Sequence, residues 1–101
     1  MISFAISRNR DVLRGLRLSG IDGVFCKDKN DLKTNFLETK EKKNIGLIIL
    51  TEPDFNEIEE EVTKVKIKNS LPLIVTIPGI NGLEDKNFIL KYIKDSIGLK
   101  I

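Results

Sequence analysis

Residues 44–55 read NIGLIILTEPDF, and the order of the structural elements can be worked out in both directions from this stretch. Ile45 to Thr51 is apolar on both faces apart from one glycine, which is typical of a central strand in a parallel sheet that helices cover on each side. Pro53 lacks an N–H and has a preset φ, so it suits the first turn of a helix. Asp54 and Glu57 belong in that turn, where carboxylates meet the positive end of the helix dipole. The stretch therefore predicts a buried strand that passes directly into a helix.

Apolar spacing extends this pattern toward both ends of the chain. Strands are predicted at Ile2–Ile6, Asp22–Cys26, Ile45–Thr51 and Leu71–Ile77. Helices are predicted at about 9–20, 30–43 and 53–68 and from about Glu84 onward, where apolar residues recur at helical spacing. Asn9 can cap the first helix, and Gly20 can end it in a left-handed conformation.

The predicted fold class is α/β, a small four-stranded parallel sheet with helices on both faces in the Rossmann-like or flavodoxin-like manner. The order β-α-β-α-β-α-β-α with short connections and right-handed crossovers gives this architecture. The preferred strand order is 2-1-3-4. Residues 1–82 are expected to form the α/β core, and residues 83–101 the C-terminal helix and tail.

The composition argues against several functional classes. The 101 residues suffice for one domain, and 41% apolar and 32% charged residues fit an ordinary globular protein. The net charge is only +2, with both signs interspersed, which argues against nucleic-acid binding. There is no histidine, so a Ser-His or Cys-His nucleophile pair and a histidine-ligated metal site are excluded. Cys26, the only cysteine, is expected to be a small buried hydrophobe rather than a reactive thiol.

The acidic end of the opening stretch is a candidate chemical site, because ligands of such sheets bind beyond the carboxyl ends of the strands. Neither the phosphate-binding GxxxxGK[ST] nor the dinucleotide fingerprint GxGxxG is present. A phosphoacceptor receiver domain needs acidic residues after the first strand to hold Mg²⁺, and Ser7, Arg8 and Asn9 stand there instead. Only Glu52 lies near the acceptor position, and one carboxylate beside Arg8 is a poor cation site. We therefore expect a structural role, with no catalytic residue, metal or cofactor.

The last predicted helix carries an unusually wide apolar face. On a wheel of 100° per residue its apolar residues span roughly 200°, where a helix on one sheet face needs somewhat over ~100°. Either this helix is wedged deeply into its own domain, or part of its face belongs to a partner protein. One leucine of the first helix also lies off that helix's apolar stripe. The candidate interface residues are Leu18, Phe88, Ile89, Tyr92, Ile93 and Ile97.

Three segments carry a family resemblance in their order and spacing. They are LRGLRLSGI at Leu13–Ile21, IGLIILTE at Ile45–Glu52 and LPLIVTIPG at Leu71–Gly79. The chain resembles the F subunit of V-type and A-type ATPases, which reads roughly GFRLAGI, IGIILITE and PAVLEIPS at the same places. The resemblance covers nearly the whole chain.

The resemblance implies a non-catalytic rotor component on the cytoplasmic side of the membrane, attached to it only through the complex. It implies as partners the coiled coil of the D subunit, the other central-stalk subunits and the catalytic A/B hexamer. It also implies that the C-terminal helix binds the D subunit and modulates hydrolysis. The alternatives are a free-standing receiver-like regulatory domain, which would accept a phosphoryl group, and a small flavodoxin-like cofactor binder, which would be coloured or fluorescent.

Overall fold

Parallel strands alternate with helices in the computed structural model, which describes residues 2–68 and 71–78. The elements are β1 (Ile2–Ser7), α1 (Arg10–Leu18), β2 (Asp22–Phe25), α2 (Lys29–Thr39), β3 (Ile45–Thr51), α3 (Glu52–Glu57), α4 (Glu59–Lys68) and β4 (Leu73–Ile77). The helix predicted from Glu84, and with it the division of the chain between residues 82 and 83, lies outside the described residues.

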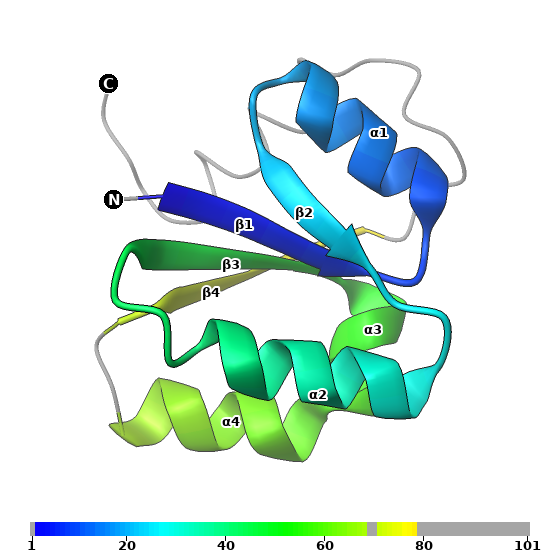
Figure 1. The fold of residues 1–101 in the computed structure, drawn as a ribbon. Coiled ribbons are helices and arrows are strands. Elements are labelled where there is room, and N and C mark those ends of the chain that lie inside the picture. Colours follow the sequence, from blue (N-terminus) through cyan, green and yellow to red (C-terminus); the bar gives the residue numbers. More distant parts are fainter. Residues whose placement is uncertain (1, 69–70, 79–101) are drawn as a thin grey trace.

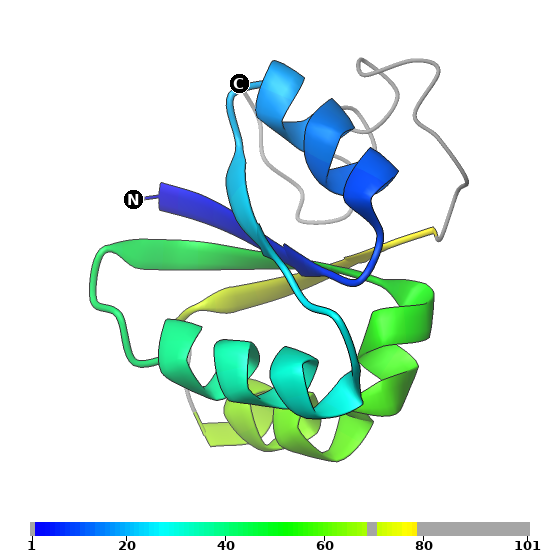
Figure 2. The same ribbon diagram turned by 45° about the vertical axis from the view of Figure 1, so that its right-hand side comes forward.

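The strands of the described residues form one sheet in the order β2-β1-β3-β4, and each neighbouring pair is parallel. Helix α1 lies on one face of the sheet, and α2, α3 and α4 lie on the opposite face (Figure 1). The same division is visible in the view turned by 45° (Figure 2). The predicted α/β class, the parallel sheet with helices on both faces and the strand order 2-1-3-4 are therefore confirmed.

Successive strand residues point to opposite faces and build two apolar cores. The core on the α1 side contains Ala5, Val12, Leu16, Ile21, Leu47, Ile49, Val75 and Ile77. The core on the other side contains Ile6, Cys26, Leu32, Phe36, Ile45, Ile48, Leu50, Ile58, Val62 and Val65. All 7 residues of β3 are buried, as its uninterrupted apolar run predicts. The central strand thus joins the two cores.

Helix α1 begins and ends where its sequence signals predict. The Asn9 side chain accepts hydrogen bonds from the backbone N–H groups of Asp11 at 2.9 Å and Val12 at 3.2 Å, which satisfies two donors of the first turn. After the helix, Gly20 has a φ of 90°, in the left-handed region that glycine enters without strain. These two residues fix the length of α1, and with it the place where the chain turns back into β2.

The segment predicted as one helix over residues 53–68 forms two helices, with a break at Ile58. Ile58 has φ −125° and ψ 29°, and its N–H donates to the Phe55 carbonyl oxygen at 3.1 Å in the tighter i→i−3 pattern. Its side chain is nevertheless buried in the core under α4. The break lets α3 follow directly on β3 while α4 runs along the sheet (Figure 1). Helical spacing alone gives no sign of such a change in direction, so the prediction of one helix was wrong.

Among the other boundaries that differ from the prediction, two have a clear local cause. Helix α2 ends at Thr39 rather than near Lys43, because the charged residues after it are mostly exposed and offer no apolar face to pack. Strand β4 begins at Leu73 rather than Leu71, because Pro72 has no N–H to donate to the ladder.

Candidate functional site

The carboxyl edge of the sheet is closed by an ion pair between the loop that follows β1 and the first turn of α3, which follows β3 directly. The Asp54 carboxylate is buried, and its Oδ1 accepts a hydrogen bond from Arg8 Nε at 2.6 Å. Its Oδ2 accepts from the Arg8 backbone N–H at 3.2 Å and from the Thr51 hydroxyl at 2.9 Å. Charge-assisted bonds of this kind are short and strong. Three donors therefore hold one carboxylate in place.

Local chain geometry explains why these groups meet. Thr51 ends β3 and caps α3, and its hydroxyl oxygen also accepts from the backbone N–H of Asp54 at 3.4 Å. Asp54 thus lies in the first turn of α3, as the sequence predicts, with Pro53 before it. Arg8 comes directly after β1, the neighbour of β3 in the sheet, and its Nη2 also donates to the Pro53 carbonyl oxygen at 3.3 Å.

This arrangement is unfavourable for a phosphoacceptor or a cation site at the carboxyl edge of the sheet. In a receiver domain acidic groups after the first strand face the acceptor carboxylate, whereas here a guanidinium occupies that place. Within the described ranges, no three His, Cys, Asp or Glu side chains gather as a metal site requires. Glu52 is exposed and takes no part in the ion pair. The structural role of this edge stays a prediction. The contact between Arg8 and Asp54 was missed, although the sequence places both after neighbouring strands.

Cys26 lies directly after β2, fully buried, and its backbone N–H donates to the Ser7 carbonyl oxygen at 2.8 Å. Burial, followed by the negative charges of Asp31 and Asp54, raises the pKa of its thiol from the usual 9.0 to about 11. Because the thiolate is the reactive form, this thiol is unsuited to nucleophilic chemistry near neutral pH. The predicted buried hydrophobe is confirmed.

We expect the Cys26 thiol to react with 5,5′-dithiobis(2-nitrobenzoate) at pH 8 at least about 100-fold more slowly in the folded protein than in urea. The rise in the thiol pKa from 9.0 to about 11 alone lowers the thiolate fraction by about that factor, and burial lowers access further. The release of thionitrobenzoate measures both rates. Equal rates would contradict the burial of this side chain.

Because the pKa of the Cys26 thiol is higher in the folded state, its contribution to the free energy of unfolding falls as the pH rises. The unfolded thiol loses its proton near pH 9.0 and the folded thiol near pH 11, so the contribution of Cys26 is complete below pH 9 and is lost as the pH rises to 11. The Cys26→Ala variant is the control, because it has no thiol to ionise, and it should lose less stability over the same pH interval.

Of the predicted interface residues, only Leu18 lies among the described residues. It ends α1, and its side chain is 73% exposed, in agreement with its place off the buried stripe. Its role at an interface stays a prediction. The remaining candidates, Phe88, Ile89, Tyr92, Ile93 and Ile97, lie outside the described residues.

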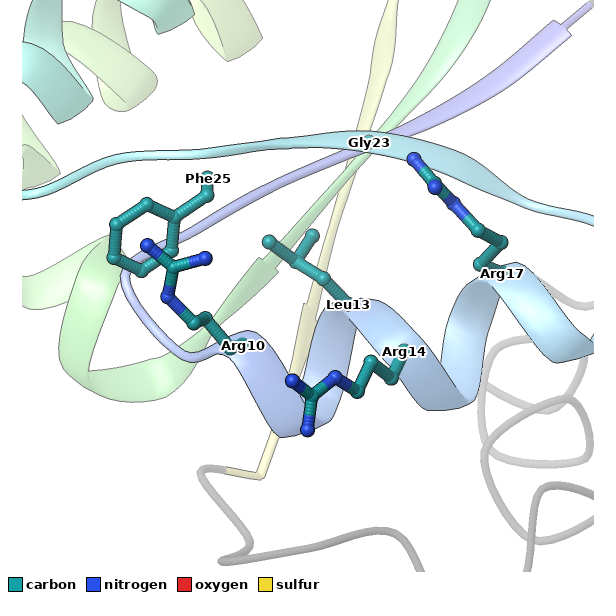
Figure 3. Close-up of a pocket in the computed structure, with 6 residues that line it drawn as sticks. All are labelled: Arg10, Leu13, Arg14, Arg17, Gly23 and Phe25. Atoms are coloured by element: carbon teal, nitrogen blue, oxygen red, sulfur yellow. The ribbon is translucent and has the colours of Figure 1, made fainter.

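A second feature of the surface was missed by the sequence reasoning. A shallow groove of about 180 Å³ lies between α1 and β2, and three arginines contribute to its lining (Figure 3). The lining residues are Arg10, Leu13, Arg14, Arg17, Gly23 and Phe25. The arginine spacing is visible in the sequence, but the strand residues that complete the groove are brought there by the fold.

These features define a small doubly wound α/β domain of the flavodoxin-like type, with a carboxyl edge closed by an ion pair. The sequence profile of the family described as ATP synthase (F/14-kDa) subunit matches residues 4–93. The chain therefore belongs to this family, which comprises the F subunits of the A-type and V-type ATPases.

Similar proteins from several organisms agree with this assignment. The chain is 30% identical over 92 residues to the F subunit of the A-type ATP synthase from Thermoplasma volcanium, an alignment that covers 91% of this chain and 88% of the relative. Identity to the same protein of Thermoplasma acidophilum is also 30%, with the same coverage. The F subunit of Methanococcoides burtonii is 24% identical over 100 residues, or 99% of this chain and 98% of the relative. In the described part of the chain no helix is long and apolar enough to cross a membrane.

Proposed function

We propose that this protein is a non-catalytic component of the central stalk, which binds the coiled coil of the D subunit and turns with it. In this position it would contact the other stalk subunits and the A/B hexamer on the cytoplasmic side. Rotation of the stalk then couples ATP hydrolysis or synthesis to ion transport through the membrane ring. The observation that carries the proposal is the family match across residues 4–93.

The geometry of the carboxyl edge favours this role over the receiver-like alternative. A receiver needs an acceptor carboxylate that is open to Mg²⁺ and a phosphoryl donor. Asp54 is buried under Arg8 and Thr51, and Arg8 brings a positive charge to the place where a cation would bind. The Asp54 carboxylate is therefore used to stabilise the domain, and its oxygens are already occupied by donors rather than open to a ligand.

The proposal assigns the C-terminal segment and Leu18 to the interface with the D subunit. The exposed leucine supports this assignment, since a side chain that is 73% exposed contributes little to the core of its own domain. The apolar arc of Phe88 to Ile97, which is wider than one sheet face requires, supports it from the sequence.

We expect truncation after Gly82 to weaken binding to the recombinant D subunit at least tenfold, or by about 1.4 kcal/mol. Calorimetric titration of the D subunit with the full chain and with the truncated chain measures the change. Circular dichroism of the truncated chain verifies that the sheet is still folded. As a second variant that keeps the full length, Tyr92→Glu should weaken binding in the same direction.

If both variants bind the D subunit with unchanged affinity, the coiled coil is still the partner, but the segment from Phe88 to Ile97 belongs to the domain's own core and not to the interface. A folded full-length chain that does not bind the D subunit would contradict the proposed function. Phosphorylation of the purified chain by acetyl phosphate with Mg²⁺ would favour the receiver-like alternative instead.

A further inference from the structure

Three arginines form a row on the outer surface of α1. Arg10, Arg14 and Arg17 are spaced i, i+4 and i+7, so at 100° per residue they lie within about 60° of one another and extend over about 10 Å. All three are exposed, while Val12 and Leu16 of the same helix are buried against the sheet. Leu18 lies about 40° beyond Arg14 on the same surface. The helix therefore presents a basic row with an exposed leucine at its margin.

The arginine row faces a groove with an apolar floor. Arg10 and Arg17 extend from α1 toward Phe25 and Gly23 of β2, and Leu13 lies between them (Figure 3). The Arg10 guanidinium carbon is 3.9 Å from the centroid of the Phe25 ring, a stacked arrangement that holds the side chain in place.

Gly23 explains how the helix approaches the strand so closely. A Cβ at this position would lie 2.7 Å from the Ala5 carbonyl oxygen and 2.8 Å from Leu13 Cδ2, so no larger residue fits without a shift. The groove floor at this point is consequently backbone, and Arg17 extends toward it from α1 (Figure 3).

The positive charges of the row are scarcely balanced by the part of the chain that the structure describes. There, neither Arg10 nor Arg17 has a carboxylate within 4.0 Å. Arg14 makes only a loose pair with Asp11 at 3.6 Å, between side chains that are 76% and 59% exposed. Such a pair contributes little. Like charges three and four residues apart on a helix are also mildly destabilising, by roughly 0.2–0.5 kcal/mol per pair. Carboxylates from outside the domain would relieve this repulsion.

We propose that this basic surface, made of Arg10, Arg14, Arg17 and Leu18, binds an acidic α-helix of a protein partner. A helix with carboxylates at i, i+4 and i+7 matches the spacing of the row, and an apolar residue beside them would contact Leu18. Arginine forms charge-assisted, often bidentate, bonds with carboxylates and is enriched at interfaces. The inference rests on the proposed function, because that function supplies a coiled-coil partner, and it names the face of this domain that meets it.

Other anions fit the surface less well. A single phosphate cannot contact guanidinium groups spread over about 10 Å, and the groove of about 180 Å³ is smaller than the roughly 300–1,000 Å³ of ordinary ligand pockets. A nucleic acid would need a longer basic stripe than three residues in a chain of net charge +2.

The test compares two charge-reversal variants of the full chain in binding to the recombinant D subunit. One is Arg14→Glu with Arg17→Glu, and the control is Lys64→Glu with Lys66→Glu on α4, which lies on the opposite face of the sheet (Figure 1). Both pairs consist of exposed side chains, change the net charge equally and place one substitution in the last turn of a helix. Circular dichroism and thermal melting verify the fold of each variant.

We expect the arginine variant to bind the D subunit at least tenfold more weakly than the wild type, and the lysine variant to bind within about twofold of it. Raising NaCl from 50 to 300 mM should weaken the wild type more than the arginine variant, because salt screens the contact that the variant lacks. Equal affinity of both variants and the wild type would overturn the inference and leave the proposed function intact.

Failure of the wild type to bind would instead overturn the proposed function, and the inference with it. A further titration tests whether the groove binds a small anion. Inorganic phosphate is added to the wild type, and the amide NMR shifts of Gly23 and Phe25 report binding. Saturation at micromolar phosphate would reassign the groove to a small anion and also overturn the inference.

Discussion

Replacing Asp54 by alanine is expected to lower the free energy of unfolding by about 3 kcal/mol, near the low end of the range for breaking a buried ion pair. The carboxylate is only 2% exposed and is held by Arg8 and Thr51. Its removal leaves the Arg8 backbone N–H and the Thr51 hydroxyl without their acceptor in a buried place. The loss stays below the upper end of the range because the Arg8 side chain, 30% exposed, can turn toward water.

Glu52→Ala is the matched control, since Glu52 lies two residues earlier in α3 and is exposed. Its effect should stay within about 0.5 kcal/mol. Urea unfolding followed by circular dichroism measures both variants, and a constant slope shows that the transition itself is unchanged. A double-mutant cycle with Arg8→Ala should give a coupling of about 1–3 kcal/mol between the two residues. Equal losses in the Asp54 and Glu52 variants would show that the ion pair does not hold the edge together.

The strands and their order could be predicted because local pattern and topology both constrain them. Ile45–Thr51 is buried on both sides, so its sequence is apolar throughout, and its predicted bounds agree with β3. A central parallel strand then requires crossover helices, and right-handed crossovers leave few ways to arrange four strands. Asn9 and Gly20 add chemical signals for the start and end of α1, which the structure confirms.

The parts that escaped prediction depend on contacts between distant residues or on small changes of direction. Arg8 and Asp54 are 46 positions apart, and only their places after neighbouring strands bring them together. The break at Ile58 leaves the apolar spacing of α4 intact, so periodicity does not reveal it. The groove between α1 and β2 is a further example. The spacing of its arginines is visible in the sequence, but only the fold places Phe25 of β2 beside them.

Substitution of Phe36 by alanine is expected to cost about 4 kcal/mol, within the usual range for a fully buried phenylalanine. Phe36 is 0% exposed and is the bulkiest of the fully buried side chains of the described residues. It lies in the core that α2 and α4 share with the sheet. Its loss removes apolar contacts and leaves a cavity that packed strands and helices on two sides cannot readily fill.

Leu37→Ala is the control, because Leu37 is the next residue of the same helix and is 37% exposed. Both substitutions keep the helix propensity of α2 or improve it, so the difference between them reports burial. The Leu37 variant should lose about 1 kcal/mol or less, and urea midpoints at constant slope measure the two. A 101-residue domain with a total stability of roughly 5–15 kcal/mol would then lose between about a quarter and four-fifths of that stability without Phe36. Similar losses in both variants would mean that α2 is not fixed to the sheet through Phe36.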